Sequence, residues 1–96
     1  MAHKDSEKLV EMTLVNEIKK AKGLCIKLVC LHMIGLPDRL CLMPGSKIAF
    51  VELKTTGEKP RRIQEYMHEK IRNLGFDVFV IDTVEEVKTL VNNMRC

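Results

Sequence analysis

The chain has 96 residues, of which 46% are hydrophobic and 30% charged, with a net charge of +3. This balance excludes a disordered chain, and the length predicts a single domain over residues 1–96. No apolar run approaches the roughly 20 residues that span a bilayer, and the N-terminus lacks the apolar core of a signal peptide. We expect a cytoplasmic protein with no membrane partner, whose mild positive charge permits a polyanionic one.

The cysteines and histidines do not have the spacing of a zinc site, because they contain no Cys-x-x-Cys pair and no matching histidine pair. We expect the cysteines to be reduced and those in apolar runs to pack as small hydrophobes. The residues concerned are Cys25, Cys30, Cys41, Cys96, His3, His32 and His68.

The first predicted element is a helix from Ser6 to Lys22. Ser6 is a favourable N-cap, and Gly23 can provide a left-handed stop. Apolar residues recur at helical spacing between them: Leu9, Val10, Leu14, Ile18 and Ala21.

A strand is predicted next, from Leu24 to Cys30. Lys27 interrupts it and either approaches a phosphate or lies on a solvated edge. The following segment, Leu31 to Leu36, is apolar and needs cover from the rest of the domain or from a second subunit. His32 lies in this segment, where a histidine is more often a packing residue than a catalyst.

A β-hairpin is predicted from Arg39 to Lys54, because two apolar runs flank the turn Pro44–Ser46. Centring the hairpin on Gly45 pairs Met43 with Lys47, Cys41 with Ala49 and Asp38 with Glu52. Directly opposed residues share a face and lie about 5 Å apart.

Asp38, Glu52 and Lys54 therefore lie on one face of the predicted hairpin. Two carboxylates this close repel each other unless a cation lies between them, and such oxygen ligands suit Mg²⁺ or Mn²⁺. With a lysine beside them, they are suited to phosphodiester hydrolysis. The alternative is a turn aspartate and a solvated Glu-x-Lys charge pattern at a strand end.

A second helix is predicted from Pro60 to Leu74, because Pro60 fits a first helical turn and Gly75 can end the helix. Gln64 lies near its start, where its amide can bond a water or a phosphate oxygen. Lys59, Arg61 and Arg62 crowd the same end and oppose the helix dipole, which favours a nearby anion such as a DNA phosphate. The alternative is a solubilising basic patch.

A strand from Asp77 to Ile81 and a helix capped by Thr83 and Glu86 close the chain. The order αβββαβα predicts an α/β (α+β) fold with a mixed sheet covered by helices on both faces.

These motifs resemble the VRR-NUC branch of the PD-(D/E)xK nucleases, in its small stand-alone phage or bacterial form. The resemblance extends from about Glu7 to Val87, but the apolar segment Leu31–Leu36 departs from the family's polar loop. The residues that carry it are Leu36, Pro37, Asp38, Arg39, Leu40, Pro44, Gly45, Phe50, Val51, Glu52, Leu53, Lys54, Gly57, Lys59, Pro60 and Gln64.

The resemblance implies a restriction-endonuclease-like core and a Mg²⁺- or Mn²⁺-dependent endonuclease. Asp38 and Glu52 then hold the metal, joined by the carbonyl of Leu53 and by an acidic residue of the first helix. Glu11 matches that residue, with Glu7 and Glu17 as competitors. Lys54 and Gln64 then position and activate the water.

Small members of the family look like Holliday-junction-resolving enzymes that act on branched DNA, which implies a homodimer. We expect its interface on the segment Leu31–Leu36 or on the outer side of the last helix, which carries Leu90 and Met94. Two alternatives remain: a flap or end-processing nuclease with the same metal site, and a catalytically inert nucleic-acid-binding module.

Overall fold

The computed structural model of the protein describes residues 4–95. Its element order is the predicted αβββαβα. The helices and strands are α1 (Glu7–Lys20), β1 (Leu24–Lys27), β2 (Arg39–Met43), β3 (Lys47–Leu53), α2 (Arg62–Asn73), β4 (Val78–Ile81) and α3 (Val84–Met94).

The four strands form one mixed sheet in the order β1-β2-β3-β4. Strand β2 is antiparallel to both β1 and β3, and β4 is parallel to β3. Helix α2 makes the crossover between β3 and β4, as βαβ geometry requires for parallel strands. The mixed sheet predicted from the sequence is confirmed.

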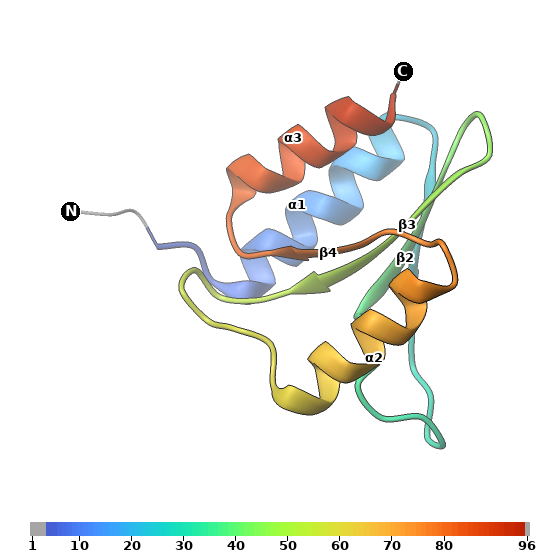
Figure 1. Cartoon of the computed structure of the whole chain (residues 1–96). Coiled ribbons are helices and arrows are strands. Elements are labelled where there is room, and N and C mark those ends of the chain that lie inside the picture. Colours follow the sequence, from blue (N-terminus) through green and yellow to red (C-terminus); the bar gives the residue numbers. More distant parts are fainter. Residues whose placement is uncertain (1–3, 96) are drawn as a thin grey trace.

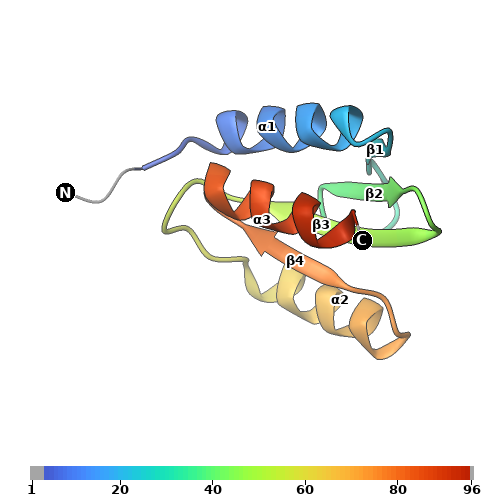
Figure 2. The same cartoon turned by 90° about the horizontal axis from the view of Figure 1, so that it is seen from above.

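The molecule has three layers, with α1 and α3 side by side on one face of the sheet and α2 on the other (Figures 1 and 2). The main core lies between the helix pair and the sheet. Its fully buried members include Val10, Leu14 and Ile18 of α1 and Cys41 and Val51 of the sheet.

The hairpin has the predicted register, with Met43 opposite Lys47 and Cys41 opposite Ala49. Side chains alternate along each strand, so Ala49, Val51 and Leu53 face α1 and α3. Glu52 lies between Val51 and Leu53 in the strand, so its side chain points to the opposite face, toward α2. The hairpin therefore gives β3 one apolar core face and one face that carries an acid.

The first helix begins as predicted, with the Ser6 hydroxyl accepting a hydrogen bond from the Leu9 N–H. The predicted role of Gly23 is wrong, because the left-handed residue that ends the helix is Lys22, with φ of 65°. Gly23 is needed for space instead. A Cβ built there would lie 2.6 Å from the Leu42 carbonyl oxygen and 2.7 Å from Met43 Sδ.

Two predicted boundaries need correction. Strand β1 ends at Lys27 rather than Cys30, although the Leu28 N–H still bonds the Asp38 carbonyl oxygen at 2.9 Å. Helix α2 begins at Arg62, two residues after the predicted Pro60, because Arg61 is extended and forms the N-cap. The remaining helix, α3, has the predicted Thr83 cap.

None of the three helices in the described part of the chain is both long and apolar enough to cross a membrane.

Candidate functional site

The end of β3 carries a buried carboxylate, Glu52, whose residue is only 1% exposed. Its Oε2 accepts a hydrogen bond from Gln64 Nε2 at 2.8 Å and lies 3.2 Å from Lys54 Nζ. Lys54 and Glu52 share a face of the strand, and α2 brings Gln64 over them. Sequence-distant polar groups thus meet under the second helix.

Asp38 lies at the start of β2, where one further step of the hairpin register places it opposite Glu52. Its Oδ2 accepts a hydrogen bond from the Leu53 N–H at 2.9 Å, so the backbone of Leu53 lies against this carboxylate. Burial raises the pKa of Glu52, and the charge of Asp38 raises it further, while Lys54 opposes both effects. The two acids are therefore close enough to repel each other.

Gln64 connects the lysine and the acid. Its Oε1 accepts hydrogen bonds from Lys54 Nζ at 3.0 Å and from the Arg61 N–H at 2.8 Å. Its Nε2 binds Glu52, so one amide orients both charged groups and caps the start of α2. This arrangement assigns Gln64 to the positioning of Lys54 and Glu52.

Two buried polar atoms have no hydrogen-bond partner among the described residues: Glu52 Oε1 and His68 Nε2. They lie 3.9 Å apart, beyond hydrogen-bond distance. Burial lowers the pKa of His68, and the charges of Arg72 and Lys54 lower it further, which favours the neutral ring. Sequence reasoning assigned no functional role to His68, because the spacing of the histidines excluded a zinc site. Its spacing of four residues from Gln64 on a helix was the signal that places both on one face.

The carboxylates fit a divalent metal ion such as Mg²⁺. A buried carboxylate oxygen without a donor is costly to leave unpaired, and a cation would satisfy it. Within residues 4–95 no group of three or more His, Cys, Asp or Glu side chains gathers round one point. Mg²⁺ needs no such group, because it is commonly held by one or two carboxylates and several waters.

The acidic residues of α1 lie in different surroundings. Glu11 accepts from Arg39, with Oε2 lying 3.0 Å from both Nε and Nη2 of the guanidinium. Glu7, one turn earlier, is close enough for its charge to raise the pKa of Glu52. Glu17 pairs with Lys20. The charge of Glu7 therefore acts on Glu52, whereas the carboxylate of Glu11 is paired with Arg39.

The predicted phosphate-binding residues separate into two places. Lys59, Arg61 and Arg62 are exposed around the start of α2, next to Gln64. Lys27 is exposed on the edge strand β1, opposite Arg39 in the sheet register. Strand alternation places Lys27 on the α1 side, so the structure does not bring it to the face that carries Glu52.

The chain is similar to known proteins, although no family model matches it. One is "Putative nuclease p44" of Acyrthosiphon pisum secondary endosymbiont phage 1, which is 42% identical over 77 residues, covering 80% of this chain and 83% of that protein. Another is a solved structure described as a VRR_NUC domain. It is 30% identical, covers 92% of this chain and 97% of its own, and has a TM-score of 0.83.

Proposed function

Because the chain belongs to the VRR-NUC family and is a nuclease with that family's restriction-endonuclease-like fold, we propose that it is a metal-dependent DNA endonuclease. The observation that carries this proposal is the buried Glu52 with the half-buried Asp38 close to it, beside Lys54 and Gln64. An ion pair kept only for stability would not need a carboxylate oxygen buried without a partner.

The proposed metal ligands are Asp38 and Glu52, with the backbone carbonyl of Leu53. When bound, Mg²⁺ or Mn²⁺ supplies Lewis-acid polarisation of the phosphate and lowers the pKa of a bound water. Two acidic residues of α1 are candidates to join the metal ligands. Glu11 is the sequence-based candidate, and Glu7 is favoured because its charge raises the pKa of Glu52.

The protein's own residues do the positioning. Lys54 is held by Gln64 Oε1 and Glu52 Oε2, so its ammonium group is fixed beside the carboxylates. From there it can orient the attacking water or stabilise negative charge on the phosphate. Gln64 fixes the positions of the Lys54 and Glu52 side chains relative to each other. Catalysis of phosphoryl chemistry requires a fixed geometry of this kind.

We propose that the substrate is DNA, with branched forms such as a Holliday junction preferred. The cations Lys59, Arg61 and Arg62 beside the site can contact the phosphate backbone of any duplex. A flap or end-processing nuclease is the second candidate, because it would use the same metal site. A protein of this kind works where the DNA is, so we place it in the cytoplasm of its cell, with residues 1–96 acting as one domain.

We also propose that the enzyme acts as a homodimer, since a junction has two symmetry-related strands to cut and residues 4–95 hold one candidate site. One of the two sequence-based positions for the interface, the outer side of α3, is polar in the structure. Leu90 and Met94 are instead buried in the protein's own core.

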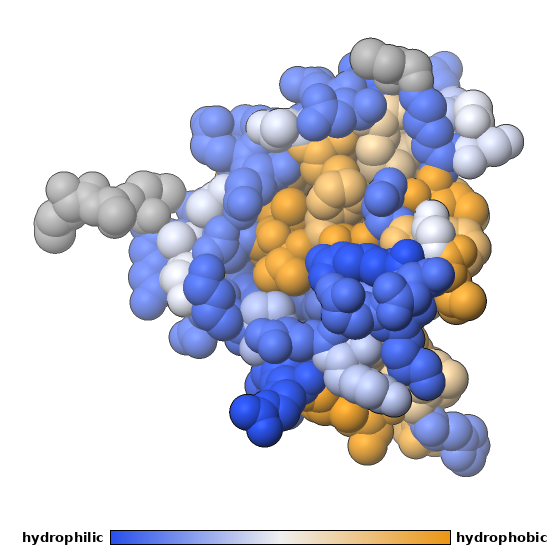
Figure 3. All heavy atoms as spheres, in the orientation of Figure 1, coloured by the Kyte–Doolittle hydropathy of each residue, from blue (hydrophilic) through white to orange (hydrophobic). Residues whose placement is uncertain are grey.

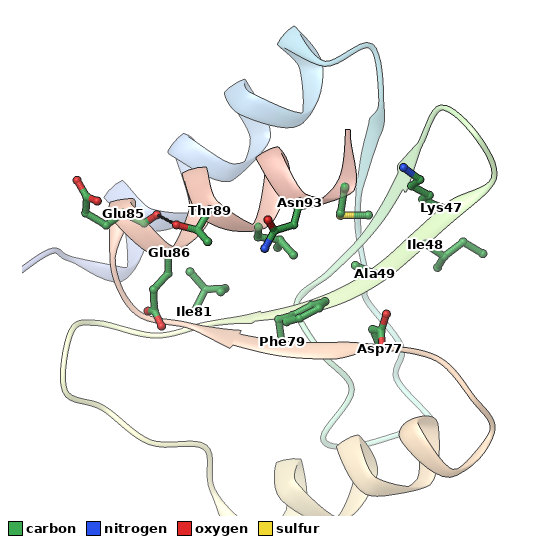
Figure 4. A pocket seen from close by; sticks show the side chains of 12 residues that line it. Lys47, Ile48, Ala49, Asp77, Phe79, Ile81, Glu85, Glu86, Thr89 and Asn93 are labelled. Carbon is green, nitrogen blue, oxygen red and sulfur yellow. Dashed lines mark hydrogen bonds between the residues drawn. The ribbon is translucent and has the colours of Figure 1, made fainter. Parts of the chain in front are cut away.

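A hollow of about 610 Å³ beside α3 is a better position for the second copy. Its floor is apolar and lies between α3 and the edge strand β4 (Figure 3). Lys47 lies at one end, with Glu85 and Glu86 at the other (Figure 4). A two-fold axis through the hollow would oppose Lys47 of one copy to these acids of the other, which makes the surface self-complementary.

The experiment that tests the function is a cleavage assay on labelled four-way junction, flap, duplex and single-stranded DNA, with and without Mg²⁺. The parent should cut with the metal and not with a chelator. Asp38→Asn should remove cutting while leaving the fold intact, and Lys54→Ala should lose turnover with metal still bound. Equal cleavage by the parent and Asp38→Asn would show that the site is wrongly assigned.

A further inference from the structure

The connection between β1 and β2 exposes large apolar side chains that the domain does not cover. We name residues Val29 to Ile34 the apolar loop. Leu31 is 91% exposed and Ile34 is 70% exposed, and Val29 and Met33 are also exposed. The prediction that the rest of the domain can cover this segment is therefore wrong. A contiguous group of exposed apolar residues on a small protein usually marks a binding surface.

Both ends of the apolar loop are fixed next to the candidate site. At its base the Leu28 N–H bonds the carbonyl oxygen of Asp38, a proposed metal ligand. At its other end Gly35 lies so close to α2 that an added Cβ would be 2.6 Å from the Ile63 carbonyl oxygen. Ile63 directly precedes Gln64. Pro37 is fully buried between these contacts and the site.

The charges around the loop favour a polyanion over a protein surface of mixed charge. Lys27 lies just before the base of the loop, and no aspartate or glutamate occurs from there to Pro37. Across the Gly35–Ile63 contact lie the exposed Arg61 and Arg62. An apolar tip flanked by cations fits DNA, whose phosphates surround a stack of apolar base faces.

We propose that the apolar loop is a wedge that enters DNA between base pairs beside the bond that is cut, with Leu31 and Ile34 as the inserting side chains. This inference rests on the proposed DNA endonuclease function. Inserted leucine, isoleucine and methionine side chains unstack a base step, which costs free energy in an intact duplex. The cost is smaller where bases are already unstacked. The wedge would therefore make the enzyme prefer branch points.

The test uses DNA that carries 2-aminopurine at the branch point of a four-way junction, and the same label within a matched duplex. Binding is measured with a chelator present, so that no cutting occurs. Parent protein should raise the 2-aminopurine fluorescence of the junction as the labelled base unstacks. Leu31→Ser with Ile34→Ser should abolish that rise and weaken junction binding about tenfold or more, since two buried apolar contacts are lost.

The matched control is Met12→Ser with Leu74→Ser, which removes two other exposed apolar side chains, on α1 and at the end of α2. This control should bind as the parent does. The salt dependence of binding should stay the same in both variants, because neither loses a phosphate contact.

The outcomes separate the wedge from the function on which it rests. A parent that binds and cuts junctions, together with a loop variant that unstacks and binds equally well, would overturn the wedge alone. A parent that cuts no DNA would overturn the proposed function. A loop variant whose sedimentation mass falls from dimer to monomer would assign the loop to contact between copies, and the wedge would then be wrong.

Discussion

At the scale of single residues, Glu52 is subject to two opposing requirements, because burial favours its neutral form and metal binding needs its ionised form. A side chain packed this deeply would be most stable if neutral, because burial and the nearby Asp38 both raise its pKa. A metal ligand must instead be ionised. Lys54 and Gln64 hold the charged form in place, but they leave Glu52 Oε1 unsatisfied. This stored cost is what we expect of a site that binds a cation.

The first prediction concerns Glu52→Gln in the absence of divalent metal. In the folded protein the pKa of Glu52 lies above its ordinary value of 4.5. The folded state therefore binds more protons than the unfolded state between those two values, and the parent loses stability as the pH rises through that window. Glutamine has no such cost, so Glu52→Gln should melt at a higher temperature at pH 7.

The check is a set of thermal melts from pH 4 to pH 8 with chelator. The advantage of Glu52→Gln should shrink as the pH falls toward 4.5, and adding Mg²⁺ should stabilise the parent and not the variant. A variant that melts below the parent throughout this range would mean that the ion pair with Lys54 outweighs burial.

Helix α2 is the element that completes the site, since it lays Gln64 and His68 over the end of β3. Its N-terminus also gathers cations that a helix dipole does not favour. Neighbouring backbone and side-chain contacts explain Gln64, but no described contact within the protein explains the exposed position of Arg62. A bound phosphate would explain both the charge and its location.

We therefore expect Arg61→Ala with Arg62→Ala to weaken DNA binding similarly for all sequences. The slope of log affinity against log salt should fall by about 1 to 2, because each lost phosphate contact retains about one counterion on the DNA. Anisotropy titrations from 50 to 200 mM salt measure the slope. Lys19→Ala with Lys20→Ala, at the far end of α1, is the control of equal charge, and a slope that both pairs change equally would make the patch a general surface effect.

The joint between α1 and β1 is the second feature at the scale of elements. Gly23 lies against the Leu42 carbonyl oxygen of the neighbouring strand, with Met43 Sδ and Ile18 also in contact. Gly23→Ala should therefore cost about 1 to 3 kcal/mol of unfolding free energy, because the helix or strand must move to admit a methyl group.

Gly57→Ala is the comparison in denaturant titrations. Its φ is 91° and nothing lies within 4 Å of an added Cβ, so backbone strain of roughly 1 to 2 kcal/mol is its sole expected cost. The two variants separate close packing from conformational strain. If Gly23→Ala leaves the midpoint unchanged, then Gly23 packs less tightly against β2 than described.

At the scale of the whole molecule, the two exposed apolar surfaces have different assignments. We propose that the hollow beside α3 and β4 binds a second copy of the protein and that the apolar loop binds DNA. The hollow borders an unpaired strand edge, which is a surface that proteins usually cover. With 96 residues the core is small, so a dimer interface would also add stability.

The fourth prediction follows from that assignment. Phe79→Glu places a charge on the floor of the hollow, and it should convert a dimer into a monomer at micromolar concentration. Ile34→Asp, on the apolar loop, should leave the mass dimeric. Sedimentation or light scattering decides, and a monomeric parent that still makes paired cuts in a junction would contradict the homodimer.

The amino-acid sequence by itself determined the element order, the mixed sheet and the hairpin register. These depend on local signals: the period of apolar residues, the turn Pro44–Ser46 and the caps Ser6 and Thr83. The grouping of Asp38, Glu52 and Lys54 followed from that register, because alternation along paired strands is a local rule.

Tertiary packing alone decided the rest. The neighbour of Glu11 is Arg39 of β2, and the neighbour of Gly23 is the carbonyl of Leu42, and neither contact has a sequence signature. The burial of Leu90 and Met94, the exposure of Leu31 and Ile34, and the approach of His68 to Glu52 depend on where α1, α2 and α3 settle on the sheet. A helix pattern predicts which side of a helix is apolar, but only packing determines what that side meets and what remains uncovered.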